Sequence, residues 1–256
     1  MQRRSSVMLY ILPSTGAVLA LIALARPAEA RCQDPPGPRV DWKGCAKTQL
    51  MLTGEDLAGA NLAKASLTST DFTSAKLAGA KLEEAEVSLA RFEGADLSGT
   101  DFAKAVGWRV NFTQANLAKA NFYAAQMSRS SFVKAKLAGA NFAKSEVNRS
   151  DFSNAEMTGL DMSKAELARV VFTGAKLSGS NVSYSNLARA RLSGLDLQGV
   201  NLTGAYLFRT QLGGANLSRA VGLTEDQLEI ACGTAETKLP AGIKPPRSWP
   251  CTEDDD

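Results

Sequence analysis

The chain has 256 residues, of which 45% are hydrophobic and 21% are charged, a composition that suits a folded domain and argues against disorder. The formal net charge of +3 is small and does not imply a partner that is attracted by the charge of the protein as a whole. The sequence contains no His, which excludes the Ser-His-Asp and Cys-His arrangements of nucleophilic catalysis.

Residues 1–30 have the pattern of a secretory signal peptide. Arg3 and Arg4 precede an apolar stretch, and Ala28-Glu29-Ala30 supplies a small-x-small cleavage site. We therefore expect export to the periplasm or the outside of the cell, with a nearly neutral mature chain that begins at Arg31. No stable membrane anchor is expected after cleavage, and a retained anchor is the alternative.

Residues 31–51 are predicted to form an N-terminal cap. Val40-Asp41-Trp42-Lys43-Gly44 already follows the five-residue pattern that continues from Leu52, and the large Trp42 occupies its central position. We interpret this segment as a plug over the first turn of a solenoid, because an open end would expose unpaired backbone groups.

Residues 52–222 repeat with a period of five. Every fifth residue from Leu52 to Leu217 is Leu, Phe, Met or Val, with the single exception of Gly107. The unit reads Ala-(Asp/Asn)-Leu-x-(Gly/Lys/Arg), as in Ala60-Asn61-Leu62-Ala63-Lys64. Because this period matches neither the strand nor the helix, the pattern predicts a solenoid.

A second period, of twenty residues, indicates how many units form one coil. Like residues stack if four units close one turn, which would place rings about 4.8 Å apart in a rod of roughly 40 Å. The residues with this spacing are Phe72, Phe92, Phe112, Phe132, Phe152 and Phe172; Phe102, Phe122 and Phe142; and Gly59, Gly79, Gly99, Gly139, Gly159, Gly179 and Gly199.

Residues 223–251 are predicted to form a C-terminal cap. Thr224 and Gln227 have the spacing of a capping box, so we expect a short helix over about 225–231 that ends at Gly233. A Pro-rich strap follows the helix, and the acidic tail at 252–256 is expected to be disordered.

The cysteines fall as one pair near each end of the repeat. Four cysteines allow three pairings, but the ends of a rod tens of Å long are too far apart for a bridge. We therefore predict two local disulfides, Cys32 with Cys45 and Cys232 with Cys251. Without His or a CxxC spacing, no metal site and no cofactor are expected.

The unit resembles that of the pentapeptide-repeat proteins over about residues 40–222, and both ends look like those of exported bacterial members. The resemblance implies an all-β fold, a right-handed quadrilateral β-helix. Some members of the family resemble a DNA duplex and bind topoisomerase, which confers quinolone resistance. That mode depends on a strongly acidic surface and on the cytoplasm, and this chain departs from both, so it is kept as a remote alternative.

One corner of the predicted solenoid carries a column of arginines, with lysines on the preceding corner. The Asp residues in the repeat's Asp/Asn position are interpreted as outward corner residues that bond to the backbone; they are Asp56, Asp71, Asp96, Asp101, Asp151, Asp161 and Asp196. The arginine column is either a solvated face, offset by Glu146, Glu166 and Asp151, or a docking ladder for an anionic polymer or an acidic partner. It comprises Arg109, Arg129, Arg149, Arg169, Arg189 and Arg209, and the lysines are Lys64, Lys104, Lys144 and Lys164.

Gly107 interrupts the central apolar positions on the same face. The favoured interpretation is local repacking, with Val106 or Trp108 turned inward to fill the hole. The alternative is an exposed Trp108 beside the arginines, which with Tyr206 and Phe208 would form a mixed aromatic and basic surface.

These observations predict a non-enzymatic, rigid scaffold that binds an unknown protein, with no catalytic residues and no small-molecule substrate. The alternative is a binder of an anionic polymer or acidic partner through the Arg and Lys face. The rod ends would also allow an end-to-end homodimer.

Overall fold

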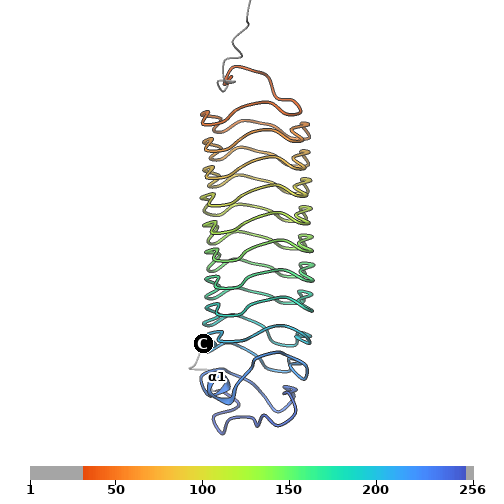
Figure 1. Cartoon of the computed structure of the whole chain (residues 1–256), viewed down its shortest axis with the longest axis vertical. Helices are drawn as coiled ribbons and strands as arrows, with labels where there is room; N and C mark the ends of the chain where they lie inside the picture. The colour runs from red at the N-terminus through yellow and green to blue at the C-terminus, as the bar shows by residue number, and fades with distance from the viewer. Residues whose placement is uncertain (1–30, 252–256) are drawn as a thin grey trace, which may run out of the picture.

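The computed structural model describes residues 31–251, which form a rod of stacked coils (Figure 1). The predicted signal peptide, 1–30, and the tail, 252–256, lie outside the described residues. The rod is a right-handed quadrilateral β-helix, as expected. Single-residue parallel bridges join residues twenty apart, from Asp41 with Asn61 to Asn201 with Val221, so four pentapeptides close each coil.

The pentapeptide satisfies its own backbone through neighbouring coils. The Leu62 N–H donates to the Lys81 carbonyl at 2.7 Å, and the Asn61 N–H donates to the Val40 carbonyl at 2.9 Å. The Ala65 N–H donates to the Leu62 carbonyl at 3.0 Å and closes the turn between two faces. Because most of these bonds run between coils, an isolated unit has no means of satisfying its polar groups.

The Asp/Asn position supplies the remaining acceptor of each turn. At every Asp of the repeat, one carboxylate oxygen accepts the N–H two residues later, an Asx-turn that confirms the predicted corner role. These residues are Asp56, Asp71, Asp96, Asp101, Asp151, Asp161 and Asp196.

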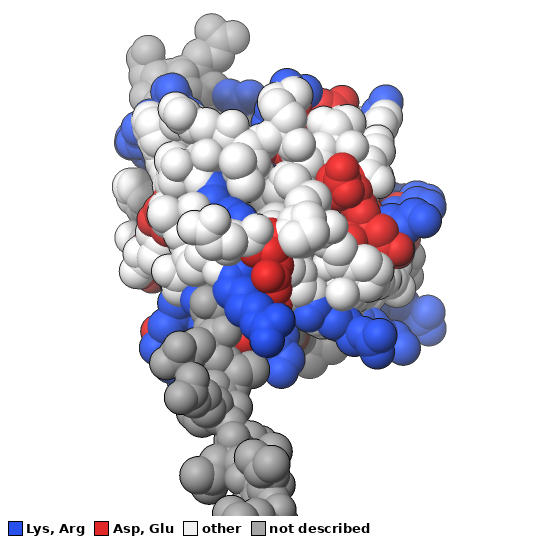
Figure 2. Space-filling model, turned by 90° about the horizontal axis from the view of Figure 1, so that it is seen from above, with Lys and Arg blue, Asp and Glu red and all other residues white. Residues whose placement is uncertain are grey.

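From Arg39 to Gly214, the last position of each repeat unit lies in the left-handed region whatever its side chain. Gly99 has a φ of 64° and Arg109 has a φ of 55°, and Lys64 has a φ of 59°. Glycine adopts this conformation without steric cost, whereas Arg and Lys hold it because the turn and the bonds to the next coil determine it. Seen along the rod, basic side chains stand at the edges of a roughly square outline (Figure 2).

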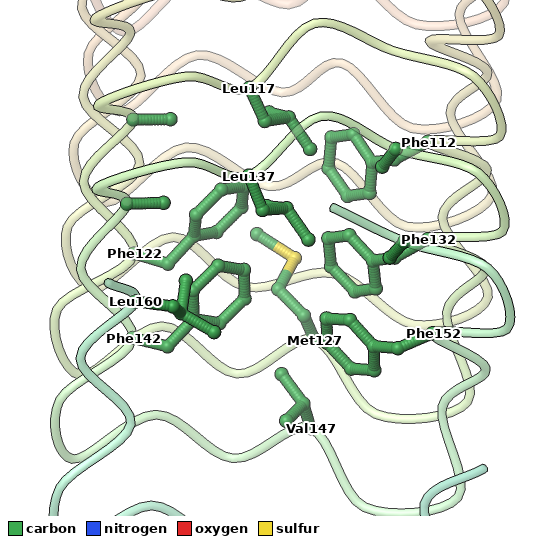
Figure 3. Close-up of a cluster of buried hydrophobic side chains, with 14 of the residues drawn as sticks. Phe112, Leu117, Phe122, Met127, Phe132, Leu137, Phe142, Val147, Phe152 and Leu160 are labelled. Atoms are coloured by element: carbon green, nitrogen blue, oxygen red, sulfur yellow. The ribbon is translucent and has the colours of Figure 1, made fainter. Parts of the chain in front are cut away.

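The core is filled by two facing columns of Phe rings (Figure 3). Within a column, ring centroids are 4.4 Å apart for Phe122 and Phe142 and 4.9 Å apart for Phe112 and Phe132, as the twenty-residue period predicts. Across the core, rings meet edge to face, with 5.7 Å between Phe112 and Phe122. The rings are fully buried, and this geometry is the one that aromatic quadrupoles favour.

The N-terminal end is closed by Trp42, which is 1% exposed and donates its indole N–H to the Asp34 carbonyl at 3.1 Å. A disulfide joins Cys32 and Cys45, whose Cα atoms are 5.5 Å apart. Bridges between neighbouring coils begin at Asp41, so part of the predicted N-terminal cap at 31–51 already forms the first coil of the β-helix.

The C-terminal end is closed by the helix α1, Glu225–Glu229, which begins with the predicted capping box of Thr224 and Gln227. The helix is two residues shorter than the predicted range of about 225–231, and the prediction that Gly233 ends it is wrong, because the cap residue is Ile230. Cys232 instead leaves the helix to bridge to Gln211 of the last coil. Gly233 has a different role, because any Cβ there would overlap the ring of Trp249.

The strap after α1 is tied back across the end of the rod. The Trp249 indole N–H donates to the Ala231 carbonyl at 2.8 Å, and a disulfide joins Cys232 to Cys251 with 5.4 Å between their Cα atoms. Across 31–251, no helix has the length and apolar character needed to cross a bilayer.

Candidate functional site

The predicted arginines lie on one corner of the rod. We call the residues Arg109, Arg129, Arg149, Arg169, Arg189 and Arg209 the Arg column, and the pentapeptides that end one residue after each of them the Arg face. All six have φ between 53° and 59°, so each side chain leaves the backbone in the same way. Because successive coils are about 4.8 Å apart, the column presents guanidinium groups at a regular spacing.

The acidic residues expected to offset the Arg column do not pair with it. In the described part of the chain, ion pairs join Lys64 to Glu84, Arg91 to Asp71 and Glu93, and Lys176 to Glu156. None involves the arginines from 109 to 189, nor Glu146, Glu166 or Asp151. The Glu166 carboxylate accepts instead from the Asn186 side chain at 2.8 Å. The guanidinium groups of these five arginines are therefore available to a partner.

The lysines of the preceding corner create a local positive potential around Tyr123. Lys144 Nζ donates to the Tyr123 hydroxyl at 2.7 Å. This hydrogen bond, together with the charges of Lys144, Lys104 and Lys164, lowers the pKa of Tyr123, because the phenolate is stabilised by adjacent cations. Lys64 belongs to the same corner but is paired with Glu84 at 3.4 Å.

The break at Gly107 is filled differently from the favoured prediction. Val106 and Trp108 both remain outside, each with 42% of its surface exposed, so inward turning of either is wrong. The space is taken by Val110, which is 1% exposed, together with Val87 and Met127 of the coils above and below. Val110 stands where most units have Ala, and its larger side chain compensates for the missing central residue.

Aromatic side chains flank the Arg column near both of its ends. The Arg109 guanidinium lies 4.2 Å from the centre of the Trp108 ring, and the Arg129 guanidinium lies 5.9 Å from it. Tyr206 and Phe208 have ring centroids 6.2 Å apart and are 51% and 38% exposed. The alternative prediction, a mixed aromatic and basic surface, is therefore what the structure contains.

Tyr184, which is 62% exposed, is an aromatic surface residue that was not predicted from the sequence. Its ring lies over Gly204 one coil later, where any Cβ would overlap it. A large residue followed by Gly twenty positions on was the available signal.

Among the described residues there is neither a free cysteine nor a cluster of metal-binding side chains. All four cysteines are in disulfides, and no group of three or more His, Cys, Asp or Glu between 31 and 251 could hold a metal ion. What the Arg face offers is a rigid array of cations and rings, which is an arrangement for binding.

A fold made of stacked pentapeptides defines a class of solenoid protein, and the sequence comparisons identify the family. The model described as "Pentapeptide repeat region" matches residues 108–173, and "Pentapeptide repeats (8 copies)" matches 52–88 and 185–221. The chain belongs to the pentapeptide repeat proteins. No curated protein matches the chain in sequence.

Two solved structures illustrate the likeness. One is HetL, a pentapeptide repeat protein involved in heterocyst differentiation regulation from the cyanobacterium Nostoc sp. strain PCC 7120, with 26% identity and a TM-score of 0.54. The similarity covers 78% of this chain and 89% of HetL. The other is a trypsin-treated form of QnrB1, a plasmid-mediated fluoroquinolone resistance protein, with 18% identity, a TM-score of 0.55 and coverage of 79% and 92%. At that identity, QnrB1 shows the fold alone.

Proposed function

We propose that this protein is an exported, non-enzymatic scaffold that binds an acidic protein partner through the Arg face. The observation that carries the proposal is the Arg column, in which five arginines from 109 to 189 make no ion pair within the described chain. Guanidinium groups form strong, bidentate hydrogen bonds with carboxylates, so a row of unpaired arginines favours an acidic surface as its partner.

The rigidity of the rod supports this role. Each arginine is held between coils by backbone bonds, such as the Arg149 N–H to the Ala168 carbonyl at 2.9 Å and the Arg169 N–H to the Ala188 carbonyl at 2.8 Å. Binding therefore orders side chains only, which reduces the entropy lost on association. The aromatic rings near both ends of the Arg column add apolar contact area, as in many protein interfaces.

The second candidate is an anionic polymer, favoured by the regular spacing of the column. A chain with evenly spaced sulfates or phosphates would meet one arginine per coil, about every 4.8 Å. The DNA-mimic mode remains the remote alternative, since the unpaired charge on this face is positive. The descriptions of HetL and QnrB1 name regulation and drug resistance, and neither names a reaction.

The test replaces Arg149, Arg169 and Arg189 together with Glu and measures retention on heparin and on a polyglutamate matrix as salt is raised. We expect the wild-type protein to be retained at low salt and released by salt, and the triple variant to flow through. A matched control carries Glu at Lys43, Lys81 and Lys134, which makes the same change in net charge away from the Arg column.

Equal losses in both triple variants would contradict the proposal, because they would show that only total charge matters. Stronger retention on polyglutamate than on heparin supports the protein partner, and the reverse supports the polymer. Export is tested separately by the mass of the secreted protein, which should begin at Arg31.

A further inference from the structure

The face opposite the Arg face carries small residues at two positions of almost every unit. We call it the Gly face; it consists of the pentapeptides 56–60, 76–80, 96–100, 116–120, 136–140, 156–160 and 176–180. Its fourth position is Gly in every unit except at Lys119, and its third position is always Ala, Ser or Thr. At Gly79 and Gly99 an added Cβ would meet nothing within 4 Å, and the same backbone angle accommodates Arg109 on another corner. The fold therefore permits side chains here, and their absence leaves room for a neighbouring molecule.

The first position of the Gly face carries a ladder of alternating charge. In order along the rod, it reads Asp56, Lys76, Asp96, Asn116, Lys136, Glu156 and Lys176. Read from the other end, every sign is inverted about the neutral Asn116. On the other three faces the same position lacks this property. The charged residues there on the Arg face, Glu86, Glu146 and Glu166, are all acidic, and on each of the remaining two faces no single axis pairs every charge of the column with its opposite.

The self-complementary stretch coincides with the regular part of the Gly face. Parallel bridges join each ladder residue to the next from Asp56 to Lys176 without a gap. The following bridge, between Lys176 and Asp196, is missing from the described structure, and bridging resumes only between Asp196 and Asn216. The ladder residues thus share one spacing, about 4.8 Å, over the whole complementary stretch.

Most of these charges lack an ion-pair partner within their own chain. Although opposite charges are neighbours along the ladder, only Glu156 and Lys176 form an ion pair, at 3.6 Å. Asp56, Lys76, Asp96 and Lys136 form none among the described residues. The alternating charges of the ladder therefore contribute few ion pairs within one chain.

We propose that the Gly face binds a second copy of this chain, face to face and antiparallel, about a twofold axis that passes beside Asn116. A twofold axis that lies in the interface and crosses the rods at right angles maps each column of residues onto itself in reverse order. Asp56 then faces Lys176, Lys76 faces Glu156, and Asp96 faces Lys136, each pair occurring twice. The Asn116 side chains meet at the axis.

The shape of the face fits this arrangement. Packed sheets lie about 10 Å apart, a gap that an Asp or Glu opposite a Lys can span, and the small Ala, Ser and Gly residues beside the ladder do not obstruct the approach of the second copy. Parallel rods would instead place each ladder against the small third-position residues, with no charge matching. Lys119, which is exposed at the corner near the axis, can direct its side chain into solvent. Because the paired charges are largely exposed, the dimer should weaken as salt is added.

Cysteine cross-linking tests the position of the axis. The native cysteines are all in disulfides, so a single introduced thiol reports on its own position. We expect a bismaleimide linker with a span of about 10 Å to join two copies of the Asn116→Cys variant, because residue 116 faces its own copy across the gap of about 10 Å between packed sheets, which is too wide for a disulfide. The matched control is Asn216→Cys: both asparagines occupy the same position of the repeat and donate to an Asp one coil earlier, at 2.9 and 3.2 Å. In the proposed dimer the two copies of residue 216 are about 48 Å apart, so this variant should stay monomeric on a denaturing gel.

Charge exchange tests the ladder. By sedimentation equilibrium at low salt, we expect the wild-type protein to be a dimer, the Lys136→Glu variant to be a monomer, and the Asp96→Lys/Lys136→Glu double variant to be a dimer again. Lys and Glu both occur naturally at this position of the Gly face, so the coil tolerates each substitution, which circular dichroism will check.

Two results would overturn the proposal. One is a wild-type monomer at low salt, with no preference for cross-linking at residue 116 over residue 216. The other is a dimer that persists in the Lys136→Glu variant and does not cross-link at residue 116, since that behaviour belongs to an end-to-end dimer.

Discussion

The coils up to Phe172 and the coils after it share one sequence grammar but differ in what fills them. In the first region Phe rings stack in register, with 4.5 Å between Phe132 and Phe152. The last pair, Phe152 and Phe172, is looser, at 5.5 Å and 22° between planes, and Leu192 takes the next place in the column. Beyond that point Leu and Val fill the axis alone.

The replacement of Phe by Leu in the core coincides with a gap in the bridges between coils. The bridge between Lys176 and Asp196 is missing from the otherwise continuous series that the described residues form. A hollow opens in the core at the same level, lined by Phe172, Leu177, Val182, Leu187, Leu192, Leu197, Val200 and Leu202. The difference teaches that the pentapeptide pattern is enough to build a coil, since the Leu-filled coils before Phe72 also bridge without a gap, and that the loss of packing is confined to the level where the Phe column ends.

The largest effect is expected from removing a ring in the first region. Phe132→Ala should lower the free energy of unfolding by about 3–5 kcal/mol, because the cavity lies between packed rings that cannot collapse into it. Leu192→Ala, in the looser region, should cost less. Chemical denaturation of both variants measures the difference, and an equal or larger loss at Leu192 would refute the comparison.

Opening the C-terminal cap should be the next largest effect. Replacing Cys232 and Cys251 with Ala removes a bridge across a sequence separation of 19, worth about 3 kcal/mol in the loop-entropy model. We expect amide exchange to rise in the coils after residue 172 and to change little between 60 and 150. Uniformly faster exchange along the rod would mean that the two regions unfold as one unit.

Extending the Phe column should strengthen the weaker region. Leu192→Phe places a ring in line with Phe172 and fills the hollow, so we expect a gain of about 1 kcal/mol. In contrast, Leu137→Phe adds volume to the tightly filled region and should cost about 1–3 kcal/mol. The same sign in thermal or chemical denaturation of both variants would show that the hollow does not limit stability.

The smallest effect concerns the surface of the first region, where regular spacing brings Lys144 to Tyr123. The lysine stabilises the phenolate, so Tyr123 ionises at lower pH than an ordinary tyrosine. Lys144→Met should move this ionisation to higher pH, as followed by phenolate absorbance, without a change in fold. Lys134→Met, on a different corner, serves as the control; a matching shift in that variant would indicate a general charge effect.

The amino-acid sequence by itself determined the solenoid, its four faces, the stacked Phe columns, the Arg column and the two disulfides. In a solenoid, residues that contact each other in neighbouring coils are separated by a constant number of positions, so the period of the sequence predicts which residues are in contact.

Only the tertiary structure shows how the core is packed where the repeat pattern is interrupted, and which of several neighbouring residues a side chain contacts. Val110 rather than Val106 or Trp108 fills the space at Gly107, and α1 stops early because Cys232 pairs with the last coil. The five arginines from 109 to 189 make no ion pair with the described residues, although acidic residues lie on the same face. These outcomes depend on differences of an ångström or less in packing and hydrogen bonding, which a repeat pattern does not contain.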